Sequence, residues 1–246
     1  MIQMNKPLEI GYQDVDYTGN LRLSRLFDIF SNIATIHATK IGVWNDEMMQ
    51  KYGWIVSKMH LEILKPITPD VYELWTFTGL SSKVIFPRYY YLKQNDDMLV
   101  KASSIWTLLD LKNRRITLPK RAGIEFPQDE DDVSSFCKLP DDIPQELNYQ
   151  LVEVRQVKFS DVDTNQHMNN ARYIEWACDI LPYELFRSYY IREVDIYFKH
   201  EIAPLSKVEL YLAKENELYF VQGVVQGEIC FEIKIKLKKI NESANN

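Results

Sequence analysis

An internal repeat constrains the fold of this chain more than any other feature of its sequence. Residues 12–29 align without gaps on residues 159–176, and both segments carry an Asp-Val-Asp triplet followed by an arginine. The matched pairs are Asp14 and Asp161, Val15 and Val162, Asp16 and Asp163, Arg25 and Arg172. In each half the segment joins a predicted strand to a predicted helix. The sequence therefore predicts one strand–helix unit that occurs twice.

Hydrophobic periodicity predicts the same order of elements in both halves, namely a strand, a helix and four further strands. In the first half the helix covers Leu23–Ile41, with apolar residues at steps of three and four, and the strands cover 8–13, 54–64, 71–78, 84–94 and 98–110. In the second half the helix lies near 169–181, and the strands lie near 151–160, 190–200, 206–214, 217–226 and 229–239.

A long helix packed against an antiparallel sheet is the hotdog arrangement, since the helix buries one apolar stripe on the sheet. The predicted class is α+β, a tandem (double) hotdog, and the 246 residues suit two such domains. We expect the two sheets to join edge to edge. The expected division is an N-terminal domain at 1–122, a proline- and acid-rich linker at 123–149, and a C-terminal domain at 150–246.

Charge and cysteine content narrow the class of function. The chain has 29 basic and 35 acidic residues, a net charge of -6, which argues against a general nucleic-acid binder. Its three cysteines lie far apart, and no CxxC or HExxH pattern occurs, so we expect neither a disulfide framework nor a metal site. No apolar run of about 18 residues and no signal peptide are recognisable. We therefore expect no membrane span, and a cytoplasmic location.

The densest group of polar residues lies between the first strand and the helix of the second half. It consists of Asp161, Asp163, Asn165, His167, Asn169 and Asn170. Free N–H groups and the positive dipole end at a helix start favour a developing oxyanion, which is the functional interpretation of this group. The alternative is structural, because Asp and Asn before a helix are usually caps. The residues alone leave both interpretations open.

The repeat favours a functional interpretation for two of these residues. At the matching positions of the first half, Asn165 is replaced by Thr18 and His167 by Asn20, whereas both aspartates are kept. Asn169 and Asn170 are replaced by Arg22 and Leu23. A site that is needed once can decay in one copy. The repeat therefore supports a functional role for Asn165 and His167 more strongly than for the two aspartates.

The segment DVDTNQHMNNARYIEW resembles the active-site segment of acyl-ACP thioesterases of the plant and bacterial double-hotdog type. The likeness runs from about residue 8 to 240 and includes WIVSKMHLEILKPITPDVYELWTF in the first half. The resemblance implies four catalytic residues, Asp163, Asn165, His167 and Glu201. Many plant members have a cysteine next to that glutamate, where this chain has Ile202. The first-half residue that roughly matches Glu201 is Lys65.

The resemblance further implies hydrolysis of fatty acyl-[acyl-carrier-protein] in fatty acid biosynthesis, without a cofactor. In the hypothesis that we adopt, Glu201 activates water and His167 shares the proton transfer. Asn165 and a backbone N–H hold the oxyanion, and Asp163 orients Asn165 or His167. The first domain would keep a degenerate site and line the acyl tunnel. Candidate substrate-binding residues are Asn169, Asn170, Phe27, Phe30 and Trp54, with Trp75 and Trp106 as further tunnel candidates. Aromatic residues at these spacings are, however, more often simply core.

Acyl carrier protein is acidic, so its docking face on the enzyme should be basic. The segment LKNRRITLPKRAG offers Lys112, Arg114, Arg115, Lys120 and Arg121. A solvated charged loop is an equally good interpretation. The alternatives for function are an acyl-CoA thioesterase, a non-catalytic acyl-thioester binding protein and, less favoured, a hydroxyacyl dehydratase. The sequence is compatible with a monomer or a homodimer.

Overall fold

The computed structural model describes residues 3–125, 136–144 and 146–240, and the element order in the two halves is the predicted one. The first half contains β1 (Gln3–Ile10), α1 (Leu23–Lys40), β2 (Tyr52–Ile63), β3 (Asp70–Thr78), β4 (Phe86–Gln94) and β5 (Asp97–Asp110). The second half contains β7 (Gln150–Gln156), α3 (Asn170–Asp179), β8 (Tyr189–Phe198), β9 (Lys207–Glu215), β10 (Leu218–Val225) and β11 (Glu228–Lys239).

A few short elements were not predicted. They are α2 (Asp46–Met49), β6 (Arg115–Thr117), and the 3₁₀ turns η1 (Tyr12–Asp14), η2 (Pro119–Ala122), η3 (Phe159–Asp161) and η4 (Tyr183–Arg187). β6 folds back on β5 as a hairpin, with Arg115 opposite Asp110. The basic segment that was predicted as a docking loop is therefore partly a strand, held by the ladder to β5.

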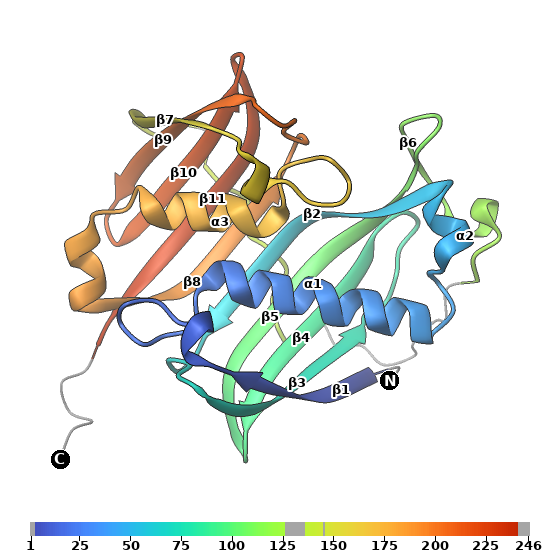
Figure 1. The fold of residues 1–246 in the computed structure, drawn as a ribbon, viewed down its shortest axis with the longest axis horizontal. Coiled ribbons are helices and arrows are strands. Elements are labelled where there is room, and N and C mark those ends of the chain that lie inside the picture. Colours follow the sequence, from blue (N-terminus) through green and yellow to red (C-terminus); the bar gives the residue numbers. More distant parts are fainter. Residues whose placement is uncertain (1–2, 126–135, 145, 241–246) are drawn as a thin grey trace.

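All strands belong to one 11-stranded sheet, whose order is β1-β3-β4-β5-β2-β8-β11-β10-β9-β7 with β6 on β5 (Figure 1). The two halves join through β2 and β8, which pair antiparallel from Lys58 opposite Tyr197 to Glu62 opposite Glu193. This confirms the expected edge-to-edge junction. Pairing at the junction covers an edge strand of each half, which would otherwise expose unpaired backbone groups.

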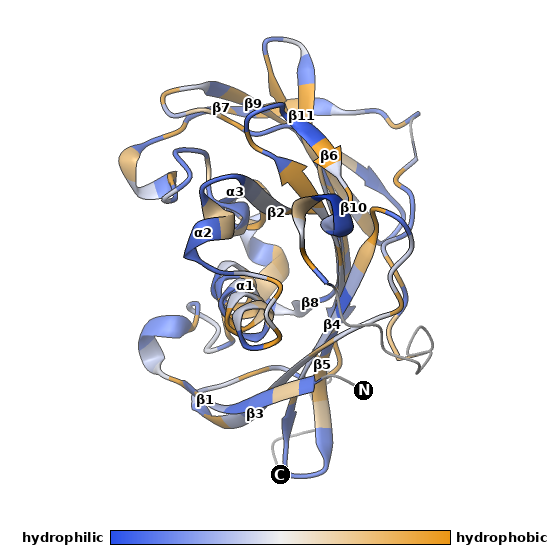
Figure 2. Ribbon diagram, turned by 90° about the vertical axis from the view of Figure 1, so that its right-hand side faces the viewer, coloured by the Kyte–Doolittle hydropathy of each residue, from blue (hydrophilic) through white to orange (hydrophobic). Residues whose placement is uncertain are grey.

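The two long helices lie on the same side of the sheet (Figure 2). α1 buries the stripe that contains Leu26, Phe30 and Ile33, and α3 buries Ile174 and Trp176. These side chains belong to a single apolar core that runs through both halves. α1 ends where Gly42 takes a φ of 77°, a left-handed conformation that suits glycine. The fold is the predicted α+β tandem hotdog.

The described part of the expected linker lies on the other face of the sheet, away from the helices. Ser103 on β5 donates a hydrogen bond to the Lys138 carbonyl at 2.6 Å, and the Tyr197 hydroxyl on β8 donates to the Asp141 carbonyl at 2.6 Å. Ile143 is buried against Phe220. The segment thus crosses strands of both halves, while Pro127 and the acidic run 129–132 lie outside the described residues.

Candidate active site

The loop before α3 forms a closed turn that presents its side chains to one end of the helix. Val162 and Met168 form an antiparallel bridge, and the Asp163 N–H donates to the His167 carbonyl at 2.9 Å. Gln166 within the turn has a φ of 64°. The same position in the first-half loop holds Gly19 with a φ of 80°. The backbone is therefore alike in both halves, and only the side chains differ.

Asp163 holds Asn165 in place from within the turn. Its Oδ1 accepts the Asn165 backbone N–H at 2.8 Å, and its Oδ2 accepts the Asn165 Nδ2 at 3.4 Å. An amide that is fixed in this way can present a polar group to a ligand at little further entropic cost. The predicted orienting role of Asp163 fits this arrangement.

Glu201 lies beside His167 because the loop is tied to the segment that follows β8. The Met168 N–H donates to the Ile202 carbonyl at 2.8 Å. His167 Nε2 then lies 3.4 Å from Glu201 Oε2, and both side chains are about one third exposed, at 33% and 37%. The two residues predicted to move the proton are thereby close together and open to water.

Arg114 also contacts Glu201, and it comes from the first half of the chain. Its Nη2 donates to Glu201 Oε2 at 2.7 Å. Arg114 sits in the turn between β5 and β6, with a φ of 50°. Sequence reasoning had assigned Arg114 only to a docking surface. Nothing in the spacing of the sequence signals a contact between residues 87 positions apart.

The start of α3 has a helix cap at Asn169 and an unpaired backbone N–H at Asn170 among the described residues. The Asn169 side chain accepts the Ala171 N–H at 2.7 Å, so the structural interpretation of Asn169 as a helix cap is confirmed. Among the residues that the structure describes, the Asn170 N–H has no protein acceptor. It lies at the positive end of a ten-residue helix, where an anion is stabilised.

Asp161 has a structural role that its first-half counterpart shares. Its Oδ2 accepts the Lys158 N–H at 2.8 Å, as Asp14 Oδ2 accepts the Gly11 N–H at 3.0 Å. Both aspartates close the 3₁₀ turn before the loop. The repeat had already indicated this difference, because Asp161 is kept in the first half whereas Asn165 and His167 are replaced.

The first-half loop has the same backbone conformation, but its polar side chains hydrogen-bond to one another. Thr18 Oγ1 donates to Asp16 Oδ1 at 2.6 Å, and Asn20 Nδ2 donates to Thr18 Oγ1 at 2.9 Å. The Leu21 N–H donates to the Ile67 carbonyl at 2.7 Å, as Met168 does to Ile202. This aligns Pro66, not Lys65, with Glu201. The expected match to Lys65 was off by one residue, and the first half has no carboxylate at the equivalent position.

A cavity of about 90 Å³ opens beside Asp163 and the start of α3. It lies between the two helices and the sheet, and residues of both halves line it. From the candidate set, Phe27, Phe30, Trp106, Asn169 and Asn170 line this cavity. Trp54 does not line it, since its Nε1 donates to the Val43 carbonyl in a neighbouring cluster. Trp75 stacks on Tyr91, with ring centres 5.4 Å apart. Along β3 it alternates with the buried Leu74 and Thr76, so it points to the opposite face of the strand and does not line this cavity.

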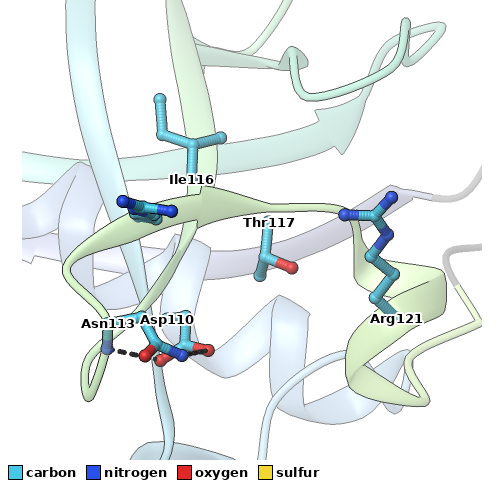
Figure 3. A pocket seen from close by; sticks show the side chains of 6 residues that line it. Asp110, Asn113, Ile116, Thr117 and Arg121 are labelled. Atoms are coloured by element: carbon cyan, nitrogen blue, oxygen red, sulfur yellow. Dashed lines mark hydrogen bonds between the residues drawn. The ribbon is translucent and has the colours of Figure 1, made fainter.

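The remaining basic residues of the predicted docking segment are exposed, namely Lys112, Arg115, Lys120 and Arg121. A larger, open cleft of about 530 Å³ lies on this segment, lined by Asp110, Asn113, Arg115, Ile116, Thr117 and Arg121. Figure 3 shows Thr117 between the hairpin turn that carries Asn113 and the η2 turn that carries Arg121. The lining is mostly polar, unlike that of the cavity beside α3.

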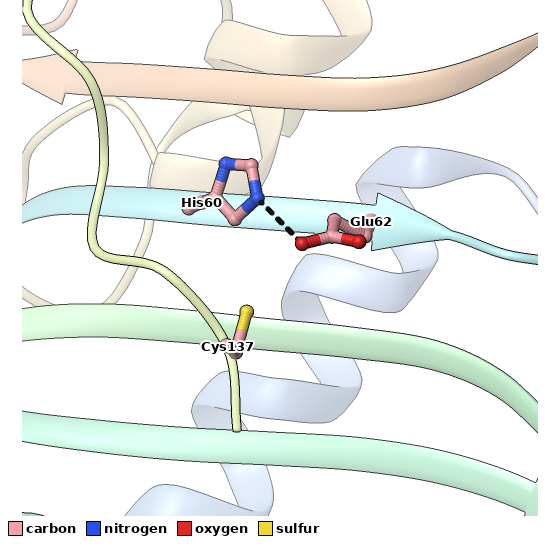
Figure 4. A group of neighbouring side chains, drawn as sticks. All are labelled: His60, Glu62 and Cys137. Carbon is pink, nitrogen blue, oxygen red and sulfur yellow. Dashed lines mark hydrogen bonds and ion pairs between the residues drawn. The ribbon is translucent and has the colours of Figure 1, made fainter. Parts of the chain in front are cut away.

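One group of described residues brings together side chains that could hold a metal ion. His60, Glu62 and Cys137 have donor atoms within 4.8 Å of one another (Figure 4). His60 Nδ1 lies 2.6 Å from Asp195 Oδ1, across the junction of β2 and β8. Burial raises the pKa of the Cys137 thiol to about 12, so this cysteine is not a ready nucleophile. The expectation that no metal is bound stays a prediction.

In the part of the chain that the structure describes, no helix has both the length and the apolar character needed to cross a bilayer. That finding agrees with the lack of a long apolar run in the sequence.

Comparisons with known proteins identify the relatives of this chain. The model of the acyl-ACP thioesterase N-terminal domain matches residues 3–119, and that of the C-terminal domain matches residues 145–244. A chloroplastic acyl-[acyl-carrier-protein] hydrolase of Cuphea viscosissima is 24% identical over 89% of this chain and 57% of its own length. A chloroplastic oleoyl-acyl carrier protein thioesterase of Arabidopsis thaliana is 23% identical over 73% of this chain and 54% of its own length. The chain thus spans little more than half the length of these curated relatives.

Solved structures support the fold. An acyl-ACP thioesterase from Bacteroides thetaiotaomicron superposes with a TM-score of 0.80 at 20% identity, covering 96% of this chain and 98% of that one. The 12:0-ACP thioesterase from Umbellularia californica superposes with a TM-score of 0.78 at 15% identity, covering 98% of both chains. At these identities the likeness establishes a shared fold.

Proposed function

Because the chain belongs to the acyl-ACP thioesterase family, we propose that it hydrolyses fatty acyl-[acyl-carrier-protein] and releases free fatty acid for fatty acid biosynthesis. The observation that supports this most is the 3.4 Å approach of His167 to Glu201 at the start of α3. The first half lacks both side chains, since Asn20 and Pro66 stand there. The same scaffold without these groups would bind an acyl chain but would not hydrolyse its thioester.

In the proposed mechanism Glu201 takes a proton from water, and the water oxygen attacks the thioester carbonyl carbon. His167 shares this proton transfer and releases the proton to solvent. The developing oxyanion accepts hydrogen bonds from the Asn165 side chain and the Asn170 N–H, and one such donor typically contributes about 10²–10³ in kcat. The C–S bond then breaks and the thiolate leaves. A thiolate needs little acid assistance, so no strong general acid is required.

A covalent route through an acyl-Glu201 intermediate is the competing mechanism. In that route water hydrolyses the mixed anhydride, and an oxygen of Glu201 exchanges with solvent when the water attacks the glutamyl carbonyl. Single-turnover hydrolysis in H₂¹⁸O followed by mass spectrometry of the Glu201 peptide separates the two routes. Label in the peptide would rule out direct attack by water.

Arg114 fixes the Glu201 carboxylate by its contact with one carboxylate oxygen. Glu201 Oε2 accepts the hydrogen bond from Arg114 and lies near His167 Nε2, whereas Oε1 has no partner among the described residues. A carboxylate that is held at one oxygen has its other oxygen free for water. We therefore give Arg114 a positioning role, supplied by the first half to the site of the second.

The acyl chain would enter the cavity beside Asp163. About 90 Å³ is small for a long acyl chain, as ligand cavities usually measure roughly 300–1,000 Å³. Binding therefore needs side chains such as Phe30 and Met59 to move apart. The first domain contributes most of the lining, which is a physical reason to keep a copy without catalytic groups.

Steady-state kinetics on matched acyl-ACP and acyl-CoA substrates test the proposed function. We expect thiol release from both, with the higher kcat/KM for acyl-ACP. A higher value for acyl-CoA would favour the acyl-CoA thioesterase alternative. No release across several chain lengths, with retained acyl binding, would favour the non-catalytic binding protein.

Several finer assignments accompany this proposal. The domain division at 122 and 150, the cytoplasmic location and a monomer or homodimer remain predictions. Carrier docking on Lys112, Arg115, Lys120 and Arg121 rests on their positive charge and exposure. Charge reversal at Lys112 and Lys120 should raise KM for acyl-ACP and leave KM for a small acyl thioester unchanged. An unchanged KM for acyl-ACP would remove the docking assignment.

A further inference from the structure

The geometry points to the cleft between the β5–β6 hairpin and η2 as a binding site for the phosphate of a phosphopantetheine thioester. This inference rests on the proposed function and assigns a part of the substrate to a part of the surface. The cleft measures about 530 Å³ and is the larger of the two hollows described above. Its lining is dominated by polar atoms, which is unsuited to an acyl chain.

Two guanidinium groups supply the positive charge of the cleft. Arg115 comes from β6 and Arg121 from η2, so they belong to the hairpin and to the turn that faces it. Within the described ranges neither arginine pairs with a carboxylate, whereas their neighbour Arg114 pairs with Glu201. Two unpaired arginines offer the planar, multiple donors that suit a phosphate.

The single acid of the cleft is already engaged. Asp110 accepts the Asn113 N–H at Oδ1 and the Asn113 Nδ2 at Oδ2, both at 2.9 Å (Figure 3). These hydrogen bonds hold the pKa of Asp110 below its usual value, so it stays ionised but faces its own turn. Thr117 adds a hydroxyl to the lining. The groups left to meet a ligand are therefore mainly hydrogen-bond donors.

The hairpin connects this cleft to the catalytic residues. Arg114 contacts Glu201, and its chain neighbour Arg115 lines the cleft. Consecutive Cα atoms lie about 3.8 Å apart, so the two side chains start close together, and one contacts Glu201 while the other lines the cleft. A thioester at Glu201 and a phosphate at Arg115 are thus spanned by one flexible arm. A phosphopantetheine arm has a thioester at one end and a phosphate at the other.

Both acyl carrier protein and coenzyme A present this phosphate, so the shared chemistry is that of the arm. The test compares one acyl chain on pantetheine, on 4′-phosphopantetheine, on coenzyme A and on acyl carrier protein. Pantetheine and phosphopantetheine thioesters differ only by the phosphate. The ratio of kcat/KM for the carrier and coenzyme A substrates of the wild type shows which source is preferred.

We expect the double variant R115Q/R121Q to raise KM for acyl-phosphopantetheine by about tenfold or more, since two charge-assisted hydrogen-bonding groups are lost. Its kcat and its KM for acyl-pantetheine should stay unchanged. The matched control is Lys83→Gln, which removes an exposed positive charge that neither lines the cleft nor belongs to the docking segment. Equal changes on the two substrates, or an equal effect of Lys83→Gln, would overturn the inference.

A binding measurement keeps the inference testable if the chain proves not to be a hydrolase. Calorimetry with S-dodecyl phosphopantetheine and S-dodecyl pantetheine, both non-hydrolysable thioethers, needs no turnover. Tighter binding of the phosphate form by the wild type, lost in R115Q/R121Q, supports the cleft. Equal affinities of the wild type for the two thioethers contradict it. Absent thiol release with intact phosphate selectivity would refute only the proposed function.

Discussion

His167 and Asn20 occupy the same place in two loops that share their backbone hydrogen bonds. Each follows an aspartate that accepts the N–H two residues later, at 2.8 Å in both loops. In the first loop Asn20 bonds to Thr18, whereas in the second His167 faces Glu201. The aspartates therefore stabilise the loop backbone, and the proposed chemistry depends on which side chain follows, Asn20 or His167.

Arg114 is the residue that most extends the predicted site. We expect Arg114→Gln to lower kcat on acyl-pantetheine by about tenfold to a hundredfold, because a carboxylate that loses its fixed orientation is a poorer base. KM on this phosphate-free substrate should not change. Arg114→Lys should restore part of kcat, since it returns the charge without the fork geometry.

The matched control for Arg114 is its neighbour Arg115→Gln, for which we expect unchanged kcat. A purely structural role of Arg114 would lower the free energy of unfolding and alter KM and kcat together. An Arg114→Gln variant with wild-type kcat would show that the contact to Glu201 has no part in catalysis.

The sequence predicted those site residues that lie in one segment. Asp163, Asn165 and His167 share a loop, and the repeat made two of them stand out. Glu201 needed the family resemblance, and its first-half partner was misassigned as Lys65. The Ile-x-Pro motifs at Ile67–Pro69 and Ile202–Pro204 would have aligned Pro66 with it. Arg114 could not be predicted, because its contact depends on how the two halves are joined.

Among the elements, α3 packs against β11, and β11 in turn lies close to β10 at Gly223. Gly223 of β10 lies opposite Phe231 of β11. The Phe231 ring contacts Tyr173 of α3 edge-on, with ring centres 4.8 Å apart. A Cβ on Gly223 would lie 1.9 Å from this ring. The missing side chain at Gly223 thus makes room for the aromatic residue that packs against α3.

We therefore expect Gly223→Ala to lower the free energy of unfolding by about 1–3 kcal/mol, the usual cost of overpacking a core. Urea denaturation followed by circular dichroism measures it. Lys214→Ala on the adjacent strand β9 is the control, since its side chain is exposed. A Gly223→Ala protein as stable as the control would mean that the ring moves aside freely.

Long, periodic elements were predicted best, for a physical reason. The eighteen residues of α1 and the strands β5 and β11 repeat their apolar pattern over many positions, so their type was predictable. The elements α2 and β6 have four and three residues, too few for a period. β6 exists because β5 offers it a ladder, and this tertiary cause leaves no mark in its own sequence.

At the scale of the whole molecule, the junction of β2 and β8 makes the two halves one folding unit. His60 on β2 and Asp195 on β8 are both fully buried, and their side chains meet at 2.6 Å. Lys234 Nζ lies 2.8 Å from the other Asp195 oxygen. Burial raises the pKa of Asp195, but His60 and Lys234 outweigh it and hold this pKa below its usual value.

We expect Asp195→Ala to destabilise the protein by about 3–5 kcal/mol, because it leaves buried partners uncompensated. The contribution of the carboxylate is present above its usual pKa and is lost as the pH falls below it. Glu193→Ala, two residues away and partly exposed, should cost under about 1 kcal/mol. Chemical denaturation at pH 7 compares the two variants. Similar losses in both would mean that this pair does not tie the halves together.

In the proposed function the second half catalyses hydrolysis and the first half shapes the cavity, which would explain why both copies are retained. The first half contributes Phe27, Phe30 and Trp106 to the lining, and Arg114 to the site itself. Neither half is complete alone. The central claim is that hydrolysis occurs only at the second-half loop.

The most direct test is thiol release from palmitoyl-ACP by the wild type, His167→Ala and the matched first-half variant Asn20→Ala, each checked for folding by circular dichroism. We predict that His167→Ala loses a factor of about 10² or more in kcat/KM. Asn20→Ala should stay within about twofold of the wild type, because its side chain bonds only within its own loop. Wild-type activity in His167→Ala, or an equal loss in Asn20→Ala, would contradict a single site in the second half.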